Sequence, residues 1–150
     1  MATTISDATL TVTVVEDVTL GGVQRGSRTV QSVTVGEYAA RIMAVQTSFG
    51  YILKLSGARA EGTYIAADVK YLRITNKDTA NFIELLIEAT NNSNEAVVKV
   101  KAGETFMLGS MEMDAAAGDL LASHTLTGIT GIQGKANTAA VDIELVVASS

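Results

Sequence analysis

Hydrophobic and polar residues alternate along a series of short stretches, and the clearest series lies between residues 69 and 108. Along Phe82–Glu88, one side carries Ile83, Leu85 and Ile87, and the other carries Glu84, Leu86 and Glu88. A period of two places alternate side chains on opposite faces of a β-strand. This stretch is therefore predicted to be a strand that buries its isoleucine and leucine face.

The same pattern predicts strands along most of the chain. We expect them at Thr9–Val15, Arg28–Val35, Tyr38–Gln46, Phe49–Leu55, Val69–Thr75, Ala96–Lys101, Thr105–Leu108 and Ala139–Val147. Weaker strands are expected at Val18–Leu20, Thr63–Ala66 and the glycine-kinked Thr125–Ile132. The predicted inward faces carry Leu10, Val12 and Val14; Phe49, Tyr51, Leu53 and Leu55; and Val141, Ile143, Leu145 and Val147. Loops are expected at Gly21–Ser27, Asn76–Asn81 and Asn91–Glu95, and one helical turn within Met111–Leu121.

Roughly ten to twelve short strands separated by turn residues are typical of an antiparallel sandwich or barrel. No strand–helix–strand unit is visible, which argues against a parallel α/β sheet. We therefore predict an all-β fold, a single-domain antiparallel β-sandwich of jelly-roll type. One domain spans residues 1–150, with residues 1–8 as an extended N-terminal arm.

Composition narrows the classes of function. The 11 basic residues are scattered and the net charge is −5, which argues against nucleic-acid binding. Cysteine is absent, so disulfides, thiolate metal sites and cysteine nucleophiles are excluded. No apolar run reaches the roughly 18 residues of a membrane helix, and we see no secretory signal, so we expect synthesis in a cytoplasm. Only 18% of residues are charged, which favours a surface that contacts partners.

The candidate chemistry is sparse. A single histidine, His124, lies between Ser123 and Thr125 without a second catalytic partner. Glu84 and Glu88 share a strand face, as the carboxylates of a glycosidase would, yet a solvent-facing surface is favoured. Asn76, Asp78 and Asn81 offer oxygen ligands for Ca²⁺, but their spacing favours an Asx-rich turn. The GGVQRG segment lacks the context of a phosphate loop. We predict no catalytic, cofactor or metal site.

The central block resembles structural proteins of tailed bacteriophages, cyanophages especially. The resemblance covers about a quarter of the chain and lies in YLRITNKDTANFIELLI and VVKVKAGETFML. The matching residues are Tyr71, Arg73, Ile74, Thr75, Asn76, Asp78, Ala102, Gly103, Glu104, Phe106 and Leu108. It implies a virion component of jelly-roll type, foremost a decoration (cement) protein that binds and stabilises the head shell. No catalytic residue is carried over from this resemblance.

The expected partner is the major capsid protein or another virion protein, without nucleic acid or membrane, and the expected location is the virion. Sparse charge and strands without proline or many lysines predict a homo-oligomer, for which we expect a trimer. The expected anchor is the uncharged N-terminal segment, with Thr3, Thr4, Ile5 and Ser6 as interface residues. The alternative is a tail, fibre or receptor- (carbohydrate-) binding β-sandwich using Tyr38, Tyr51 or Tyr64; a small β-fold enzyme is disfavoured.

Overall fold

The computed structural model describes residues 6–89, 95–109 and 128–150. Within these ranges every regular element is a strand, which confirms the all-β prediction. The strands are β1 (Ala8–Val15), β2 (Thr19–Leu20), β3 (Val23–Gln24), β4 (Arg28–Val35), β5 (Glu37–Val45), β6 (Gly50–Ser56), β7 (Tyr64–Ile65), β8 (Val69–Asn76), β9 (Ile83–Ala89), β10 (Ala96–Val100), β11 (Thr105–Gly109), β12 (Ile129–Ala136) and β13 (Val141–Ser149). The helical turn expected within Met111–Leu121 lies outside the described residues.

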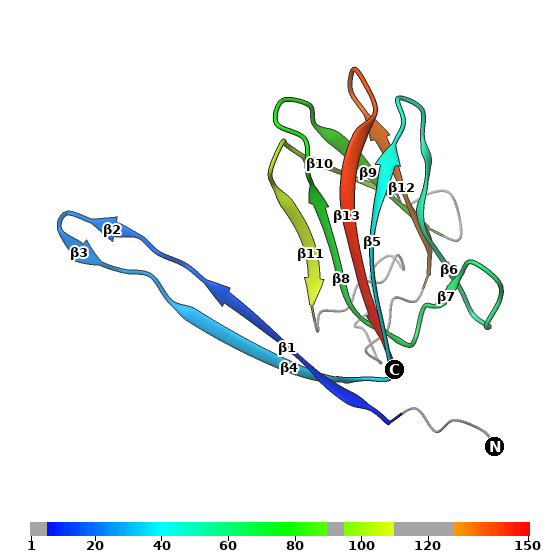
Figure 1. The fold of residues 1–150 in the computed structure, drawn as a ribbon, viewed down its shortest axis with the longest axis horizontal. Helices are drawn as coiled ribbons and strands as arrows, with labels where there is room; N and C mark the ends of the chain where they lie inside the picture. The colour runs from blue at the N-terminus through cyan, green and yellow to red at the C-terminus, as the bar shows by residue number, and fades with distance from the viewer. Residues whose placement is uncertain (1–5, 90–94, 110–127) are drawn as a thin grey trace.

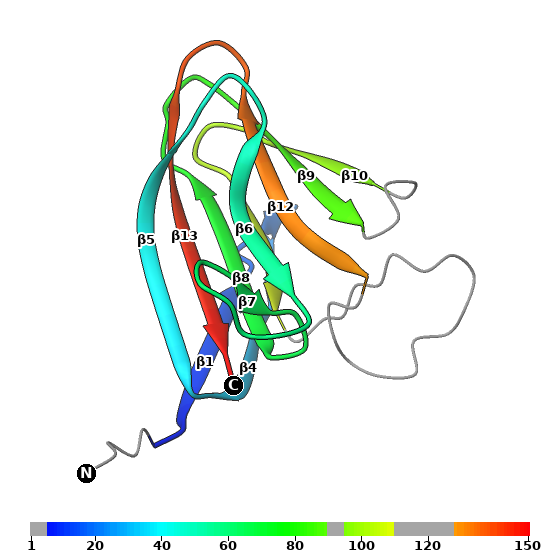
Figure 2. The same cartoon turned by 90° about the vertical axis from the view of Figure 1, so that its right-hand side faces the viewer.

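Two sheets pack face to face to form a sandwich (Figure 2). One sheet has the order β10-β9-β12-β6-β7 and the other has the order β11-β8-β13-β5. All pairs in them are antiparallel except β6 with β7, which is parallel over two residues. The sandwich is thus shown, whereas jelly-roll connectivity stays a prediction.

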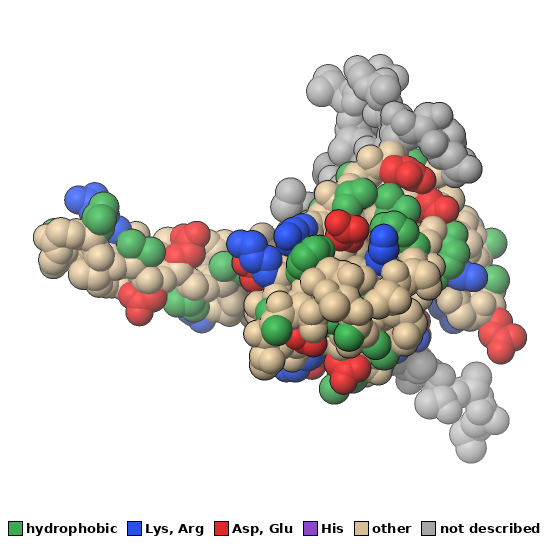
Figure 3. All heavy atoms as spheres, turned by 90° about the horizontal axis from the view of Figure 1, so that it is seen from above, with side chains coloured by type: hydrophobic (Ala, Val, Ile, Leu, Met, Phe, Trp, Pro, Cys, Tyr) green, Lys and Arg blue, Asp and Glu red, His purple; other side chains and the backbone are tan. Residues whose placement is uncertain are grey.

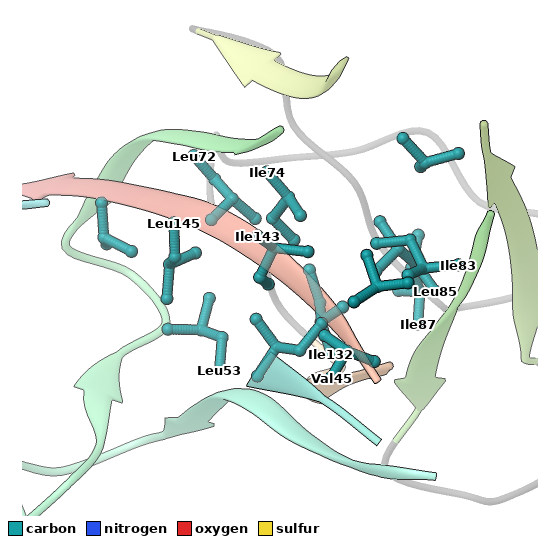
Figure 4. Close-up of a cluster of buried hydrophobic side chains, with 14 of the residues drawn as sticks. Val45, Leu53, Leu72, Ile74, Ile83, Leu85, Ile87, Ile132, Ile143 and Leu145 are labelled. Atoms are coloured by element: carbon teal, nitrogen blue, oxygen red, sulfur yellow. The ribbon is translucent and has the colours of Figure 1, made fainter. Parts of the chain in front are cut away.

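Aliphatic side chains fill the space between the sheets (Figure 4). Ile83, Leu85 and Ile87 of β9 face Val141, Ile143, Leu145 and Val147 of β13, and all seven are buried. The predicted core of these two strands is therefore confirmed. Strand β13 is a central strand, between β8 and β5.

The predicted inward face of β6 is wrong in part. Phe49 and Tyr51 are exposed, whereas Ile52, Leu53 and Leu55 are buried. The pairing with β12 explains the change, because Ile132 opposes Leu53 and the next residue, Gln133, opposes Tyr51. Ile52 is thus an extra residue in β6, and such a bulge reverses the alternation of side chains. Simple alternation could not anticipate it.

Strand β12 extends past the expected end at Ile132 to Ala136 and contains two glycines. A Cβ at Gly131 would lie 2.7 Å from the carbonyl oxygen of Leu53, so only glycine fits this approach of β12 to β6. The pairing with β9 is irregular between Ile129 and Gly131, which agrees with the predicted kink. The start of the expected strand, residues 125–127, lies outside the described residues.

The N-terminal strands do not join the sandwich. Strands β1 and β4 pair only with each other among the described strands, and β2 and β3 extend them to form one long hairpin (Figure 1). We call residues 8–35 the arm. The base of the arm lies against the four-stranded sheet, and its far end projects away from the body (Figure 1).

Candidate functional site

The arm is a two-stranded ribbon, and near its base one face is mostly apolar and the other is rich in hydroxyl groups. Cross-strand partners share a face, so Leu10, Val12 and Val14 of β1 lie beside Val33, Gln31 and Thr29 of β4. The opposite face carries Thr9, Thr11, Thr13, Ser32 and Thr34, and toward the tip also Val15 and Val30. The predicted strand is confirmed, but its predicted inward face is wrong in part, because Leu10 and Val12 are half-buried whereas Val14 is exposed.

The tip of the arm is a tight turn at Gly21 and Gly22. Their φ angles are +59° and +78°, and Leu20 opposes Val23 across the two-residue loop. Two consecutive residues with positive φ match the right-handed twist of a hairpin, and glycine reaches this conformation without a steric penalty. The Gly21–Ser27 stretch, expected to be a loop throughout, therefore contains the turn and the short return strand β3.

Hydrogen bonds hold the middle of the arm where the ladder is interrupted. The backbone N–H of Glu16 donates to the carbonyl of Ser27 at 2.8 Å, and that of Arg25 donates to the carbonyl of Val18 at 2.8 Å. The Ser27 hydroxyl donates to Glu16 Oε2 at 2.6 Å. A Cβ at Gly26 would overlap the Glu16 carbonyl oxygen and lie 2.8 Å from its carbon. The strands thus approach closely because residue 26 has no side chain.

The base of the arm is packed on the outer face of the four-stranded sheet. Leu10, Val12 and Val33 contact a second buried cluster, which consists of Val35, Tyr71, Val146 and Ala148. Val146 and Ala148 point away from the main core, yet they are 2% and 0% exposed. The arm therefore explains why the end of β13, from Leu145 to Ser149, is buried on both faces.

Beyond the base, the arm exposes large hydrophobic side chains. These residues are Val14, Val15, Val18, Leu20, Val23 and Val30, which are half of the large hydrophobics exposed in the described chain. Figure 3 shows hydrophobic side chains on the projecting segment, among acidic and basic ones. A two-stranded hairpin is at best marginally stable alone in water. The far half of the arm thus has the composition of a surface that becomes covered.

The outer face of β5 is also bare. Tyr38, Ala40 and Ile42 alternate along this edge strand, and Tyr38 and Ile42 are 57% and 69% exposed. By register, Ala40 lies beside Val146 and Tyr38 beside Ala148, so this stripe continues the surface on which the arm base packs. Beside it, Arg73 forms an ion pair with Glu144 at 2.7 Å. We call Tyr38, Ala40 and Ile42 the β5 stripe.

A cavity of about 530 Å³ lies at the open side of the sandwich. It is lined by residues of β5, β6, the 59–63 loop and β7, among them Arg41, Arg59, Glu61, Asp68, Tyr51 and Tyr64. The Arg41 guanidinium crosses from β5 to donate to the Ile52 carbonyl at 3.1 Å. The volume lies within the roughly 300–1,000 Å³ range of small-ligand sites.

Tyr51, one of the aromatic residues that line this cavity, already interacts with other side chains through both its ring and its hydroxyl group. The Tyr51 hydroxyl donates to Glu88 Oε2 at 2.7 Å, and Lys54 Nζ lies 4.7 Å from the ring centroid. The hydrogen bond to Glu88 raises the pKa of Tyr51 above its ordinary value. Two of the three tyrosines proposed for carbohydrate contact, Tyr51 and Tyr64, therefore meet at one cavity, whereas Tyr38 is outside it.

Among the described residues, the remaining candidates do not come together in one site. Of the predicted anchor, Ser6 is exposed, and Thr3, Thr4 and Ile5 lie outside the described residues, as does His124. Glu84 and Glu88 are half-buried on the outer face of β9. Glu84 is paired in register with Lys99 and Lys135, and Glu88 accepts the Tyr51 hydroxyl. The strand register and the hydrogen bond from Tyr51 are consistent with both carboxylates being parts of a polar sheet surface.

The loop after β8 forms the Asx-rich turn favoured by the sequence. Asp78 Oδ1 accepts the backbone N–H groups of Ala80 and Asn81, each at 2.7 Å, and these bonds lower the pKa of Asp78. Asn76 is fully buried; its amide donates to the carbonyls of Asn81 and Val100 at 2.9 and 3.2 Å. Its Oδ1 accepts the N–H of Asp78 at 2.9 Å. Among the described residues, no group of three acidic or histidine side chains is arranged to hold a metal ion.

Comparison with known proteins returns no match to a family model, a curated protein or a solved structure. Within the described ranges, no helix is long and apolar enough to cross a membrane. The hairpin of residues 8–35 is the feature that sequence reasoning missed, because an arm was expected only at residues 1–8. Its signal was the Gly21–Gly22 pair between two alternating runs, which is a hairpin signature.

Proposed function

We propose that this protein is a non-enzymatic structural component of a larger protein assembly, which it joins through its arm. The observation that supports this proposal is the exposed apolar far half of the arm. A monomer rarely keeps such a hairpin bare, because apolar surface is stabilised by removal from water at about 25 cal/mol per Å². The buried base and ordered turn present this surface on a fixed support.

Within that class, we propose a phage virion protein of jelly-roll type that decorates and stabilises the head shell. The likeness of the central block to tailed-phage structural proteins supports this choice, and so does the low charge of the chain. The partner is the major capsid protein or another virion protein, and a homotrimer is the expected form. Many copies on a shell make weak individual contacts effective together.

Binding to phage heads tests this proposal. Wild-type protein is mixed with phage heads from which the decoration protein has been removed. The number of bound copies per capsid protein is then measured after sedimentation. A shortened-arm variant replaces residues 14–29 with Asn-Gly, which retains Leu10, Val12 and Val33 at the base and closes the Thr13–Val30 pair with a favoured turn. We expect saturable binding by wild type and its loss in the variant. Equal binding by both proteins, or no binding by wild type, contradicts the proposal.

The N-terminal anchor is tested separately. Deleting residues 2–8 removes Thr3, Thr4, Ile5 and Ser6 and leaves the far half of the arm in place. If these residues anchor the protein, the deletion weakens head binding. Unchanged binding by the deletion variant would assign the anchoring role to the arm alone.

A second candidate function is carbohydrate binding at the β5–β6–β7 cavity. Tyr51 and Tyr64 supply aromatic surface there, and Arg59, Glu61 and Asp68 supply hydrogen-bonding groups. A glycan array probed with wild type and Arg59→Ala tests this candidate. Binding that is lost in the variant supports a receptor-binding module, and a blank array with wild-type protein refutes it.

A further inference from the structure

We infer that the far half of the arm packs on the β5 stripe of a second copy of this chain, so that the copies form a closed oligomer. This inference rests on the proposed assembly role of the arm and names its first partner. The far half of the arm and the β5 stripe are both exposed in a single chain. They resemble the two sides of a contact that the chain already makes, between the base of the arm and the outer face of β13.

The contact already made is the base of the arm on the outer face of β13. There, Leu10 and Val12 lie along one face of β1 and pack against the cluster that contains Val146 and Ala148. Val14 continues the same row of β1 but is 41% exposed, because the arm has passed beyond the sheet. Leu20 and Val23, a cross-strand pair at the tip, are also exposed. The arm thus carries its packing surface past the sheet that its base covers.

The receiving surface continues the same sheet face on the other side. The β5 stripe lies next to Val146 and Ala148 in register, and it is left uncovered by the arm of its own chain. The arm projects away from β5 in Figure 1, so its tip does not reach the stripe of the same chain. A neighbouring arm would meet aliphatic and aromatic side chains of the kind that its own base contacts.

Symmetry favours a closed arrangement. Arm and stripe are different patches, so their contact leaves one free arm and one free stripe at the ends of any open chain of copies. Closing the set covers every arm and every stripe at once, so that neither apolar patch stays exposed to water. From Val14 to Leu20 the arm spans roughly 20 Å at about 3.3 Å per residue, which is enough to lie along the β5 stripe.

Cross-linking between two introduced cysteines tests the contact, since the chain has no cysteine of its own. The double variant Leu20→Cys with Ile42→Cys is treated with a flexible bismaleimide, which tolerates differences in register. We expect a ladder of covalent oligomers that ends in one closed species. The matched control pairs Leu20→Cys with Val97→Cys, because Val97 is 59% exposed on β10 of the other sheet. No ladder is expected from this control.

The single variants identify competing arrangements. Dimers from Leu20→Cys alone, without a ladder from the double variant, would mean that arms pair with arms. Dimers from Ile42→Cys alone would mean that β5 edges pair with each other. Either result overturns the inference.

Sedimentation of the full chain provides a second measurement that does not depend on cross-linking. We expect an oligomer for wild type and Val97→Asp, and a monomer for Leu20→Asp and Ile42→Asp. A monomeric wild type at tens of micromolar overturns the inference. If such a monomer still binds phage heads through its arm, the proposed function stands and the inference fails. If an oligomer forms but does not bind heads, the inference stands and the proposed function fails.

Discussion

Gly26→Ala should open the far half of the arm and leave the sandwich folded. The added Cβ would overlap the Glu16 carbonyl oxygen and lie 3.0 Å from the Cα of Asp17, so the two sides of the arm must separate. Two backbone hydrogen bonds are then at risk, from Glu16 to Ser27 and from Arg25 to Val18. At about 0.5–1.5 kcal/mol each, their loss costs about 1–3 kcal/mol locally. Because a hairpin is only marginally stable alone, this is enough to open the far half of the arm.

Hydrogen exchange with mass spectrometry measures this effect by region. We expect peptides from residues 14–30 of Gly26→Ala to exchange faster, whereas those of β8 and β13 stay protected and the free energy of global unfolding changes by less than about 1 kcal/mol. Gly57→Ala is the matched control, since its Cβ meets no atom within 4 Å. Unchanged exchange in the arm, or a cooperative loss of the whole fold, would refute the reasoning.

Three further predictions concern the sandwich and its polar loop. Leu85→Ala removes a fully buried side chain and should lower the free energy of urea unfolding by about 2–5 kcal/mol; a loss under about 1 kcal/mol would place β9 at the surface. Backbone N–H groups lower the pKa of Asp78 in the folded state, so its stabilisation exists above the unfolded pKa and is lost as pH falls through the folded value. The excess stability of wild type over Asp78→Asn should therefore shrink below about pH 4, and a pH-independent difference would contradict this linkage. Finally, EDTA should leave the melting temperature unchanged, because Asp78 Oδ1 and Asn76 Oδ1 already accept backbone N–H groups; a loss of stability restored by Ca²⁺ would reveal an ion site.

Alternation along single strands predicted much of the sandwich. Ile83, Leu85 and Ile87 are buried because β9 has one apolar face, and that information is local to the strand. The bulge at Ile52 could not be predicted in this way, because it depends on which residues β12 places opposite β6. The burial of Val146 and Ala148 likewise depends on a segment more than a hundred residues away in sequence.

The candidate site was harder to predict than the core. The alternating run Thr9–Val15 indicates a strand in either case, and nothing local to it tells whether its apolar face meets the sandwich or leaves it. Leu10 and Val12 pack on the sheet, whereas Val14 extends past it. The tyrosines show the same limit, since only the fold brings Tyr51 and Tyr64 to one cavity and leaves Tyr38 on the β5 stripe.

Hydrogen exchange of the arm in the assembled state tests the central claim most directly. The protein is compared as a dilute free chain and as the form bound to phage heads, and the exchange of residues 14–30 is followed in each. If the arm docks on neighbouring protein, its amides become strongly protected on assembly, while β13, already paired with β8 and β5 on its two sides, changes little. Equally fast exchange of the arm in both states would contradict its role in assembly.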